Sequence, residues 1–216
     1  MEKFSVIITA GGLSSRYGNK NKLLEILGDK TVLEHSISAF TKFDNITEVI
    51  VPTNKAIIEE LRNIFNDKRI KLIEGGDTRQ KSVNNALKEV NNPYVIIHDG
   101  ARPLIEEKII KDTMASVKEY GAVSVMTKTT DTIKEVNDEG MIIRTIDRSK
   151  LYNTQTPQAF KTDIIKKAHE ILETGNYTDD SSMLEELGIP VKIIVGSYTN
   201  IKITTKSDLD FAKLYI

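Results

Sequence analysis

The chain has 216 residues, of which 39% are hydrophobic and 28% are charged, and its formal net charge is −1. This composition predicts a globular chain with a hydrophobic core, in one α/β domain or, as the alternative, in two small domains. The near-neutral charge argues against a general nucleic-acid or membrane-binding surface, and the lack of cysteine excludes disulfides, thiolate metal sites and cysteine nucleophiles.

Strand-like and helix-like patterns alternate along the first part of the chain. In chain order we expect a strand at Phe4–Thr9, a helix at Val32–Phe40, a strand at Glu48–Pro52, a helix at Lys55–Phe65, a strand at Ile70–Glu74, a helix at Arg79–Val90, a strand at Tyr94–His98, a helix at Glu106–Tyr120 and a strand at Ala122–Thr127. This alternation predicts the α/β class, with a Rossmann-like, mostly parallel sheet and flanking helices. Ligands bind such sheets beyond the carboxyl ends of the strands, so the turns there are the candidate site.

The alternation stops after residue 127. Residues 132–146 predict two strands joined by an Asn-Asp-Glu-Gly turn, which is a β-hairpin within an arm at about 131–153. An isolated hairpin is marginal in water, so the arm needs its own sheet or a second subunit to lie on. The later elements are predicted as a helix at Asp163–Thr174, a capped helix from Asp179 or Asp180 to Leu187, strands at Val191–Val195 and Asn200–Thr204 and a helix from Ser207. We therefore expect a single domain over residues 1–216 that carries a hairpin arm.

The first strand ends in a turn that favours phosphate binding. Ala10, Gly11 and Gly12 follow it directly, and Arg16 and Lys22 come soon after. Glycines let backbone N–H groups approach an anion, and the cations add charge that the backbone lacks. The segment matches neither a P-loop nor G-x-G-x-x-G. The alternative is an ordinary turn with a surface arginine.

A second candidate turn, His98-Asp99-Gly100-Ala101-Arg102-Pro103, follows another apolar strand. Asp99, at the end of that strand, is well placed to hold Mg²⁺ or a sugar hydroxyl, and Arg102 offers a bidentate fork to a phosphate or carboxylate. The alternative makes Asp99 a turn residue with Arg102 as its ion-pair partner.

A third turn, Glu74-Gly75-Gly76-Asp77-Thr78, precedes the helix that contains Ser82. Its backbone and the Ser82 hydroxyl could read the edge of a base, while Asp77 or Thr78 caps the helix. Elsewhere Arg148 and Lys202 are unremarkable taken singly, and we interpret His35 and His169 as structural. No G-x-S-x-G motif supports hydrolase chemistry.

In this order the motifs resemble the 2-C-methyl-D-erythritol 4-phosphate cytidylyltransferase family, which attaches CMP to a sugar-alcohol phosphate. The resemblance covers nearly the whole chain. It rests on the Ala10–Gly18 turn with Lys22, Gly75–Ser82, His98–Pro103, Asp131–Lys134, Asp147-Arg148, Thr156-Pro157-Gln158, Thr178-Asp179-Asp180 and Asn200–Thr204.

The resemblance implies a role for each matching position. The nucleotide would be held by Ala10, Gly11, Gly12, Gly76, Asp77, Ser82 and Gly100. Charge on the phosphates would be stabilised by the catalytic cations Arg16, Lys22, Arg148 and Lys202. The sugar phosphate would be bound by Asp99, Arg102, Thr132, Arg148 and Thr178. Asp99 would also hold Mg²⁺, the expected cofactor. The protein would be a homodimer, in which Thr132 and Arg148 come from the partner's hairpin arm.

The implied chemistry is consistent with these residue types. A substrate phosphate attacks the α-phosphorus of CTP in line, and pyrophosphate leaves. Because both reactants are anions, the enzyme's main task is to neutralise and align them, and no general base is required.

Two rival functions stay open at this point. One is a cytidylyltransferase for ribitol 5-phosphate or another pentitol phosphate, used in wall polymer synthesis. The other is a CTP-binding sensor without catalysis, since a fold does not fix a function. In each case we expect a cytoplasmic protein with no nucleic-acid or membrane partner, because neither a signal peptide nor a long apolar segment is visible.

Overall fold

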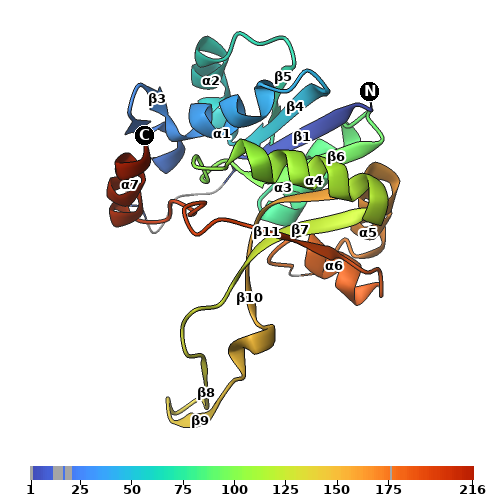
Figure 1. Cartoon of the computed structure of the whole chain (residues 1–216). Coiled ribbons are helices and arrows are strands. Elements are labelled where there is room, and N and C mark those ends of the chain that lie inside the picture. Colours follow the sequence, from blue (N-terminus) through green and yellow to red (C-terminus); the bar gives the residue numbers. More distant parts are fainter. Residues whose placement is uncertain (1, 12–16, 18–20, 176) are drawn as a thin grey trace.

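The computed structural model describes residues 2–11, 17, 21–175 and 177–216. In this part of the chain a seven-stranded sheet has the strand order β11-β7-β10-β6-β1-β4-β5 (Figure 1). The strands are β1 Phe4–Thr9, β4 Ile46–Thr53, β5 Ile70–Glu74, β6 Tyr94–Asp99, β7 Ala122–Lys128, β10 Tyr152–Lys161 and β11 Lys192–Val195. All neighbouring strands are parallel except β10, which runs antiparallel to β6 and to β7. The prediction of a mostly parallel α/β sheet with flanking helices is confirmed.

Helices cover both faces of the sheet. They are α1 Val32–Thr41, α2 Ile58–Ile64, α3 Arg79–Lys88, α4 Glu107–Tyr120, α5 Thr162–Ile171, α6 Ser181–Glu186 and α7 Lys206–Ala212. Along β1, Val6 and Ile8 join the apolar cluster under α1 and α4, whereas Ile7 joins the cluster under α3, α5 and α6. Each fully buried aliphatic side chain of this kind contributes about 1.5–3 kcal/mol. In the described residues, none of the helices has the length and apolar character needed to span a bilayer.

Local sequence signals explain where several helices begin and end. Thr31 and Glu34 form a capping box at the start of α1, and the Thr78 hydroxyl accepts the Lys81 N–H at the start of α3. The helix α4 ends at Gly121, whose φ of 79° is accessible to glycine at little cost. The expected capping role of Thr78 is thus confirmed.

The central strand β10 has no counterpart among the predicted elements. Its sequence is largely polar and contains Pro157, which lacks a ladder N–H and therefore argues against a central strand. The chain accommodates this proline with a cis Thr156–Pro157 peptide bond and a break in pairing with β7 between Thr154 and Gln158. Inspection of the sequence for apolar runs could not have identified such a strand.

The strand predicted at Asn200–Thr204 is wrong. These residues form no ladder with the sheet, and the Ile203 N–H instead donates to the carbonyl of Ala101, at 2.8 Å. The alternating pattern that suggested a strand has a different cause, because Ile203 is buried in the core while Lys202, in the same loop, is partly exposed and pairs with Asp99. This loop runs against the end of β6.

The predicted hairpin is present and lies outside the main sheet. Its strands are β8 Lys134–Val136 and β9 Ile142–Thr145, which pair antiparallel. The arm that carries them leaves after β7, returns into β10 and projects away from the body of the chain (Figure 1). Apolar side chains at its tip are largely exposed, with Met141 at 65% and Ile142 at 64%.

Smaller elements are β2 Ile26–Leu27, β3 Lys30–Thr31, η1 Lys22–Leu24, η2 Lys55–Ile57, η3 Arg148–Lys150 and η4 Lys213–Tyr215.

Candidate active site

The three candidate turns meet at one edge of the sheet. β1, β4, β5 and β6 are parallel, so their carboxyl ends lie together, and backbone hydrogen bonds join the turns that follow them. These bonds run from Ala10 N–H to the Pro52 carbonyl at 3.0 Å, from Gly75 N–H to the Thr53 carbonyl at 2.8 Å and from Gly100 N–H to the Thr9 carbonyl at 3.0 Å. The prediction that these three turns lie together at the carboxyl ends of the strands is confirmed.

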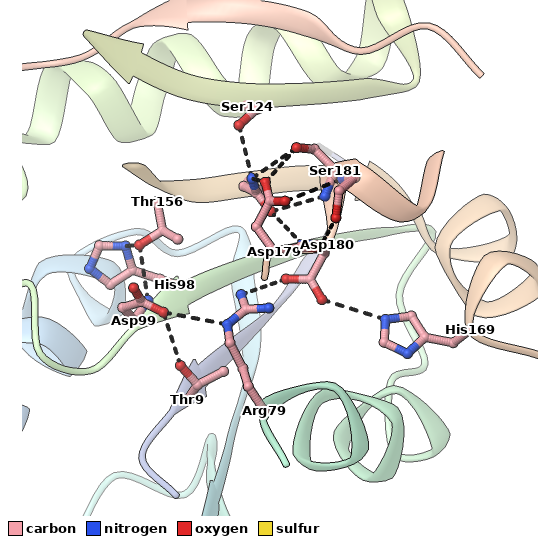
Figure 2. Close-up of polar contacts among 12 residues, drawn as sticks. Thr9, Arg79, His98, Asp99, Ser124, Thr156, His169, Asp179, Asp180 and Ser181 are labelled. Atoms are coloured by element: carbon pink, nitrogen blue, oxygen red, sulfur yellow. Dashed lines mark hydrogen bonds and ion pairs between the residues drawn. The ribbon is translucent and has the colours of Figure 1, made fainter. Parts of the chain in front are cut away.

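Asp99, at the end of β6, is the centre of an ionic cluster. Its carboxylate is nearly buried, and the Lys202 ammonium lies 2.8 Å from its Oδ2. The Nε of Arg102 is 3.5 Å from the same oxygen. The Nε of Arg79 is 3.8 Å from Oδ1, and Figure 2 shows this pair. Cations from three separate segments of the described chain therefore converge on one carboxylate.

These cations determine the ionisation of Asp99. Burial alone would raise its pKa, because a charged carboxylate loses its water. The charges of Lys202, Arg79 and Arg102 outweigh this effect and hold the pKa of Asp99 well below its usual range. Asp99 is thus an anion at neutral pH, which the function of a metal or hydroxyl ligand requires.

The backbone of Asp99 is fixed by a buried polar chain that includes His98. The Asp99 N–H donates to the Thr156 hydroxyl oxygen at 3.0 Å, and that oxygen lies 3.1 Å from Nδ1 of His98. Nε2 of His98 lies 3.1 Å from the Arg102 carbonyl, which can only accept, so Nε2 carries the proton and Nδ1 accepts from Thr156. Burial lowers the pKa of His98 to about 4, which agrees with a neutral ring.

Asn200 ties Arg102 and the Lys202 loop to the same place. The carbonyl of Asn200 accepts from the Arg102 guanidinium at 2.8 Å, and its amide donates to the Thr156 carbonyl at 2.9 Å. Because Asn200 is fully buried, the loop that follows it is held in place, and Lys202 reaches Asp99. Sequence reasoning regarded Lys202 as an ordinary edge lysine when taken alone, and the fold gives it a specific partner.

Ser82 lies between the turn at Gly75-Gly76 and the turn that follows β1. Its hydroxyl oxygen accepts the Gly76 N–H at 3.0 Å, and its proton reaches the Thr78 carbonyl at 2.9 Å. A Cβ on Gly11 would lie 3.3 Å from this hydroxyl, and one on Gly75 would lie 3.0 Å from it. The glycines of both turns thus allow the backbone to approach Ser82 closely.

Two further predicted nucleotide residues occupy different environments. Asp77 is exposed, lies just before the N-cap of α3 and pairs with Lys81, in the first turn of that helix, at 2.9 Å. Gly100 is tightly packed, since a Cβ there would lie 2.9 Å from Leu33 Cδ1 and 3.0 Å from the Thr9 carbonyl oxygen. Packing alone therefore explains a glycine at position 100.

The remaining predicted residues are distributed as follows. Gly12 and Arg16 lie outside the described residues. Lys22 begins η1, which follows the first turn and is anchored to the core by Leu23. Thr178 is exposed just before α6, at the same side of the sheet as Asp179 and Asp180.

Thr132 and Arg148 are separated from this cluster within one chain. Both lie on the exposed arm, where the Arg148 guanidinium donates to the Thr130 carbonyl. The arm leaves the carboxyl end of β7 and projects outward from the body of the chain (Figure 1). Folding of a single chain therefore does not bring these two residues together with Lys202.

Sequence reasoning missed two charged residues of the site, Arg79 and Asp180. The Arg79 guanidinium donates to Asp180 at 2.6 Å and also faces Asp99. One signal was available in retrospect, because Arg79 is the first residue of α3, where the helix dipole disfavours a cation. Asp180 lies 101 residues away in sequence, so the pairing itself could not be read from spacing.

The acidic residues limit what kind of metal site is possible. Within the described residues, no group of three or more His, Cys, Asp or Glu side chains could hold a metal ion. At the carboxyl end of β6, Asp99 offers an anionic carboxylate, and the nearby carboxylate of Asp180 is already paired with Arg79. Mg²⁺ is often bound through one or two carboxylates, with water and substrate phosphates completing its shell, so this donor set fits Mg²⁺ shared with a nucleotide.

Comparisons with known proteins give one consistent result. The IspD family model, described as 2-C-methyl-D-erythritol 4-phosphate cytidylyltransferase, matches residues 4–216. A protein of that name from Dehalococcoides mccartyi is 38% identical over 220 residues, covering 100% of this chain and 96% of the relative. Another, from Caldanaerobacter subterraneus, is 39% identical and covers 98% of each chain.

Solved structures agree with the sequence matches. The 4-diphosphocytidyl-2C-methyl-D-erythritol synthase from Anaerococcus prevotii superposes with a TM-score of 0.89 at 31% identity, covering 99% of this chain and 96% of the other. The 2-C-methyl-D-erythritol 4-phosphate cytidylyltransferase from Thermus thermophilus gives 0.83 at 28% identity, covering 100% and 98%. The similarity therefore extends over both the sheet and the arm.

Proposed function

The chain belongs to the 2-C-methyl-D-erythritol 4-phosphate cytidylyltransferase family, and we propose that the sheet edge around Asp99 is where its reaction takes place. The protein is a nucleotidyltransferase that joins CTP and 2-C-methyl-D-erythritol 4-phosphate into the CDP-alcohol and pyrophosphate, a step of isoprenoid precursor biosynthesis. The observation that carries the assignment to this site is the convergence of Lys202, Arg102 and Arg79 on Asp99. The pentitol phosphate alternative is not favoured, because the full-length matches carry the methylerythritol phosphate name.

The reaction requires the site to bind two anions, CTP and the sugar-alcohol phosphate, next to each other. The substrate phosphate oxygen attacks the α-phosphorus of CTP, a new P–O bond forms, and the bond to the leaving pyrophosphate breaks. Lys202 is 40% exposed and sits at the mouth of the cluster, so its ammonium is available to the α-phosphate. Arg102 is the cation we assign to the substrate phosphate, and we assign the Thr178 hydroxyl to the same substrate. The positive charges of Lys202 and Arg102 stabilise the transition state more than the separated reactants.

The nucleotide base and ribose are assigned to the turns that close on Ser82. Ala10 and Gly11 directly follow β1 and Gly76 lies just after β5, and we assign these residues, together with Gly12, to nucleotide binding. Glycine at these positions lets a planar base approach the backbone. Asp77 and Gly100 complete the proposed nucleotide site, with Gly100 acting through close packing.

The triphosphate is assigned to Arg16 and Lys22. Both follow the first turn, which supports a role next to the nucleotide phosphates. Mg²⁺, when bound by Asp99 and the phosphates, would neutralise part of the negative charge of CTP. The carboxylate of Asp99 is suited to this because neighbouring cations keep it ionised.

We also propose a homodimer in which the arms exchange. The exposed apolar side chains at the arm tip need a surface to cover them, which supports an arm that lies on a second subunit. Arg148 and Thr132 would then reach the partner's substrate phosphate, where a further cation and hydroxyl are needed.

We place the enzyme in the cytoplasm, where CTP is available, with no nucleic-acid or membrane partner, in keeping with its net charge of −1.

A pyrophosphate-release assay tests this function. Purified protein with Mg²⁺ is given CTP, UTP, ATP or GTP, each with 2-C-methyl-D-erythritol 4-phosphate or ribitol 5-phosphate. We expect release with CTP and the methylerythritol phosphate at a rate at least about tenfold above the other pairs. Faster release with ribitol 5-phosphate would reassign the substrate, and CTP binding without release would support the sensor.

A further inference from the structure

Two buried carboxylates at the site are linked by one arginine. The Arg79 guanidinium donates through NH2 to Oδ2 of Asp180 at 2.6 Å, and its Nε lies 3.8 Å from Oδ1 of Asp99 (Figure 2). The carboxylate charges raise the pKa of Arg79 even though burial opposes its ionised form. Arg79 is therefore a permanent cation between two anions that come from β6 and from the start of α6.

Asp180 does not cap its helix with its side chain, because its carboxylate pairs with Arg79 instead. It stands at the N-cap of α6, but its carboxylate makes no capping hydrogen bond, and Oδ1 of Asp179 accepts the Ser182 N–H instead. The Asp180 side chain is 1% exposed and turns inward, where His169 Nε2 lies 3.5 Å from its second oxygen. A buried carboxylate in this orientation needs the arginine as its counterion.

Side chains of the antiparallel strand β10 accept hydrogen bonds from the backbones of both Asp99 and Asp180. Its Thr156 accepts the Asp99 N–H at 3.0 Å, and two residues later Gln158 accepts the Asp180 N–H at 3.0 Å. Both anions are thus fixed to one strand through their backbones, and Arg79 spans the distance between their side chains. The side chain of Arg79 is only a quarter exposed, so packing keeps it in place.

We propose that Arg79, anchored by Asp180, is a positioning residue for Asp99 in cytidylyl transfer, an inference that rests on the proposed function. In the ligand-free geometry Lys202 holds Oδ2 of Asp99 at 2.8 Å, while Arg79 faces Oδ1. When the Lys202 ammonium engages the α-phosphate, Asp99 keeps Arg79 as its counterion and does not turn toward the lysine. The carboxylate then retains the orientation that the bound substrates require.

Steady-state kinetics on full-length variants test the proposal. Arg79→Gln removes the guanidinium and leaves a shorter neutral polar side chain, whereas Asp180→Asn removes the carboxylate charge isosterically. The double variant tests whether the two residues act as a unit. Lys88→Gln, an exposed change in the last turn of the same helix, is the control. Turnover and KM for both substrates are measured, and each rate is divided by the CTP-binding stoichiometry from calorimetry so that only folded sites are counted.

We expect each single variant to lose about tenfold in kcat, with the KM for CTP changed by less than about threefold. The double variant should be no worse than about threefold below either single one, because both changes break the same pair. Arg79→Lys should regain only part of the loss, since an ammonium cannot span two carboxylates as a guanidinium does. Lys88→Gln should match the wild type.

The contrary outcomes are distinct. A kcat of Arg79→Gln within about twofold of the wild type overturns the proposal, and so do independent losses that multiply in the double variant. If Arg79→Gln does not fold, the isosteric Asp180→Asn variant decides by the same criteria. A wild-type enzyme that releases no pyrophosphate from CTP and the methylerythritol phosphate overturns the proposed function and this inference together. An active wild type beside an unaffected Arg79→Gln overturns the inference alone.

Discussion

At the scale of single residues, the role of a charge depends on the neighbours that the fold supplies. Lys202 is one lysine among many in the sequence, yet its ammonium lies 2.8 Å from a nearly buried carboxylate. In the sequence Arg79 is simply the first residue of a predicted helix, whereas in the structure its guanidinium links Asp99 with Asp180. A surface ion pair contributes little, whereas an unpaired buried charge is strongly unfavourable, so the members of this cluster depend on one another.

The Lys202→Ala variant tests the cation at the mouth of the cluster. We expect turnover to fall by more than about tenfold, which corresponds to about 1.4 kcal/mol of barrier, because positive charge near the α-phosphate is lost. We expect the same of Lys22→Ala. Pyrophosphate release under saturating substrates measures the effect. The exposed Lys213→Ala variant is the control, and near wild-type turnover of folded Lys202→Ala would remove this lysine from the catalytic set.

His98 predicts how stability depends on pH. Burial lowers its folded-state pKa to about 4, below the ordinary value of 6.5. Between these pH values the unfolded chain binds a proton that the folded chain excludes, so the free energy of unfolding decreases as the pH falls from 6.5 toward 4. This contribution is fully present above pH 6.5 and amounts to on the order of 3 kcal/mol.

Urea denaturation at pH 5 and at pH 7 measures this contribution. The His98→Gln variant, which retains a donor for the Arg102 carbonyl, should lose much of the pH dependence between those values. An equally steep dependence in His98→Gln would assign the titration to another group. The control is His35→Gln, because His35 is only partly buried and lies away from Asp99.

At the scale of elements, the turns that follow β1 and β5 are shaped by glycines around Ser82. A Cβ on Gly76 would overlap with the Cβ of Lys81 and approach the Ser82 N–H, so this turn cannot accept a larger residue without moving. The turn is therefore matched to a narrow backbone geometry, which is what close approach of a ligand requires.

The Gly76→Ala variant tests the nucleotide turn. We expect its KM for CTP to rise by about tenfold or more, since the backbone that faces the base must shift, while KM for the alcohol phosphate changes less. Gly188→Ala is a suitable control. Gly188 has a φ of +69° outside the cluster, so alanine there lowers stability without touching the nucleotide turn. A similar rise in KM for CTP in both variants would mean that lost stability, not the turn, causes the effect.

The elements that the sequence predicted and those it missed differ in a physical way. Phe4–Thr9 and Ile70–Glu74 were correct to the residue, because their apolar runs and flanking turns are local signals. The strand β10 and the loop at Asn200–Thr204 were not, because their conformations are set by partners far away in the chain. The same holds for the site: the turns could be located from strand ends, but the Arg79–Asp180 pair could not.

At the scale of the whole molecule, the proposed exchange of arms would divide the proposed site between two chains. Lys202 lies at the sheet edge, whereas Arg148 lies on the exposed arm. If the arms exchange in a dimer, each site takes Lys202 from one subunit and Arg148 from the other. Two inactive variants should then be able to restore activity in mixed dimers.

Mixing Arg148→Ala with Lys202→Ala tests this arrangement. A mixed dimer contains one site with both cations intact and one with neither. After unfolding and refolding together at equal amounts, half of the dimers are mixed, so about a quarter of wild-type turnover should return. Separately refolded samples, combined afterwards without exchange, are the control. Recovery no greater than the sum of the two variants would place Arg148 and Lys202 in the same subunit or outside the reaction.

The arm begins and ends at neighbouring positions of the sheet, so it can be removed without disturbing the strands. The chain departs and re-enters at neighbouring positions, because the Thr129 N–H donates to the Leu151 carbonyl at 3.1 Å. A short glycine-containing turn could therefore replace residues 130–150 while the registers of β7 and β10 stay intact. If the proposed exchange of arms holds the dimer together, the shortened chain should fold as a monomer with unaltered CTP affinity and negligible turnover.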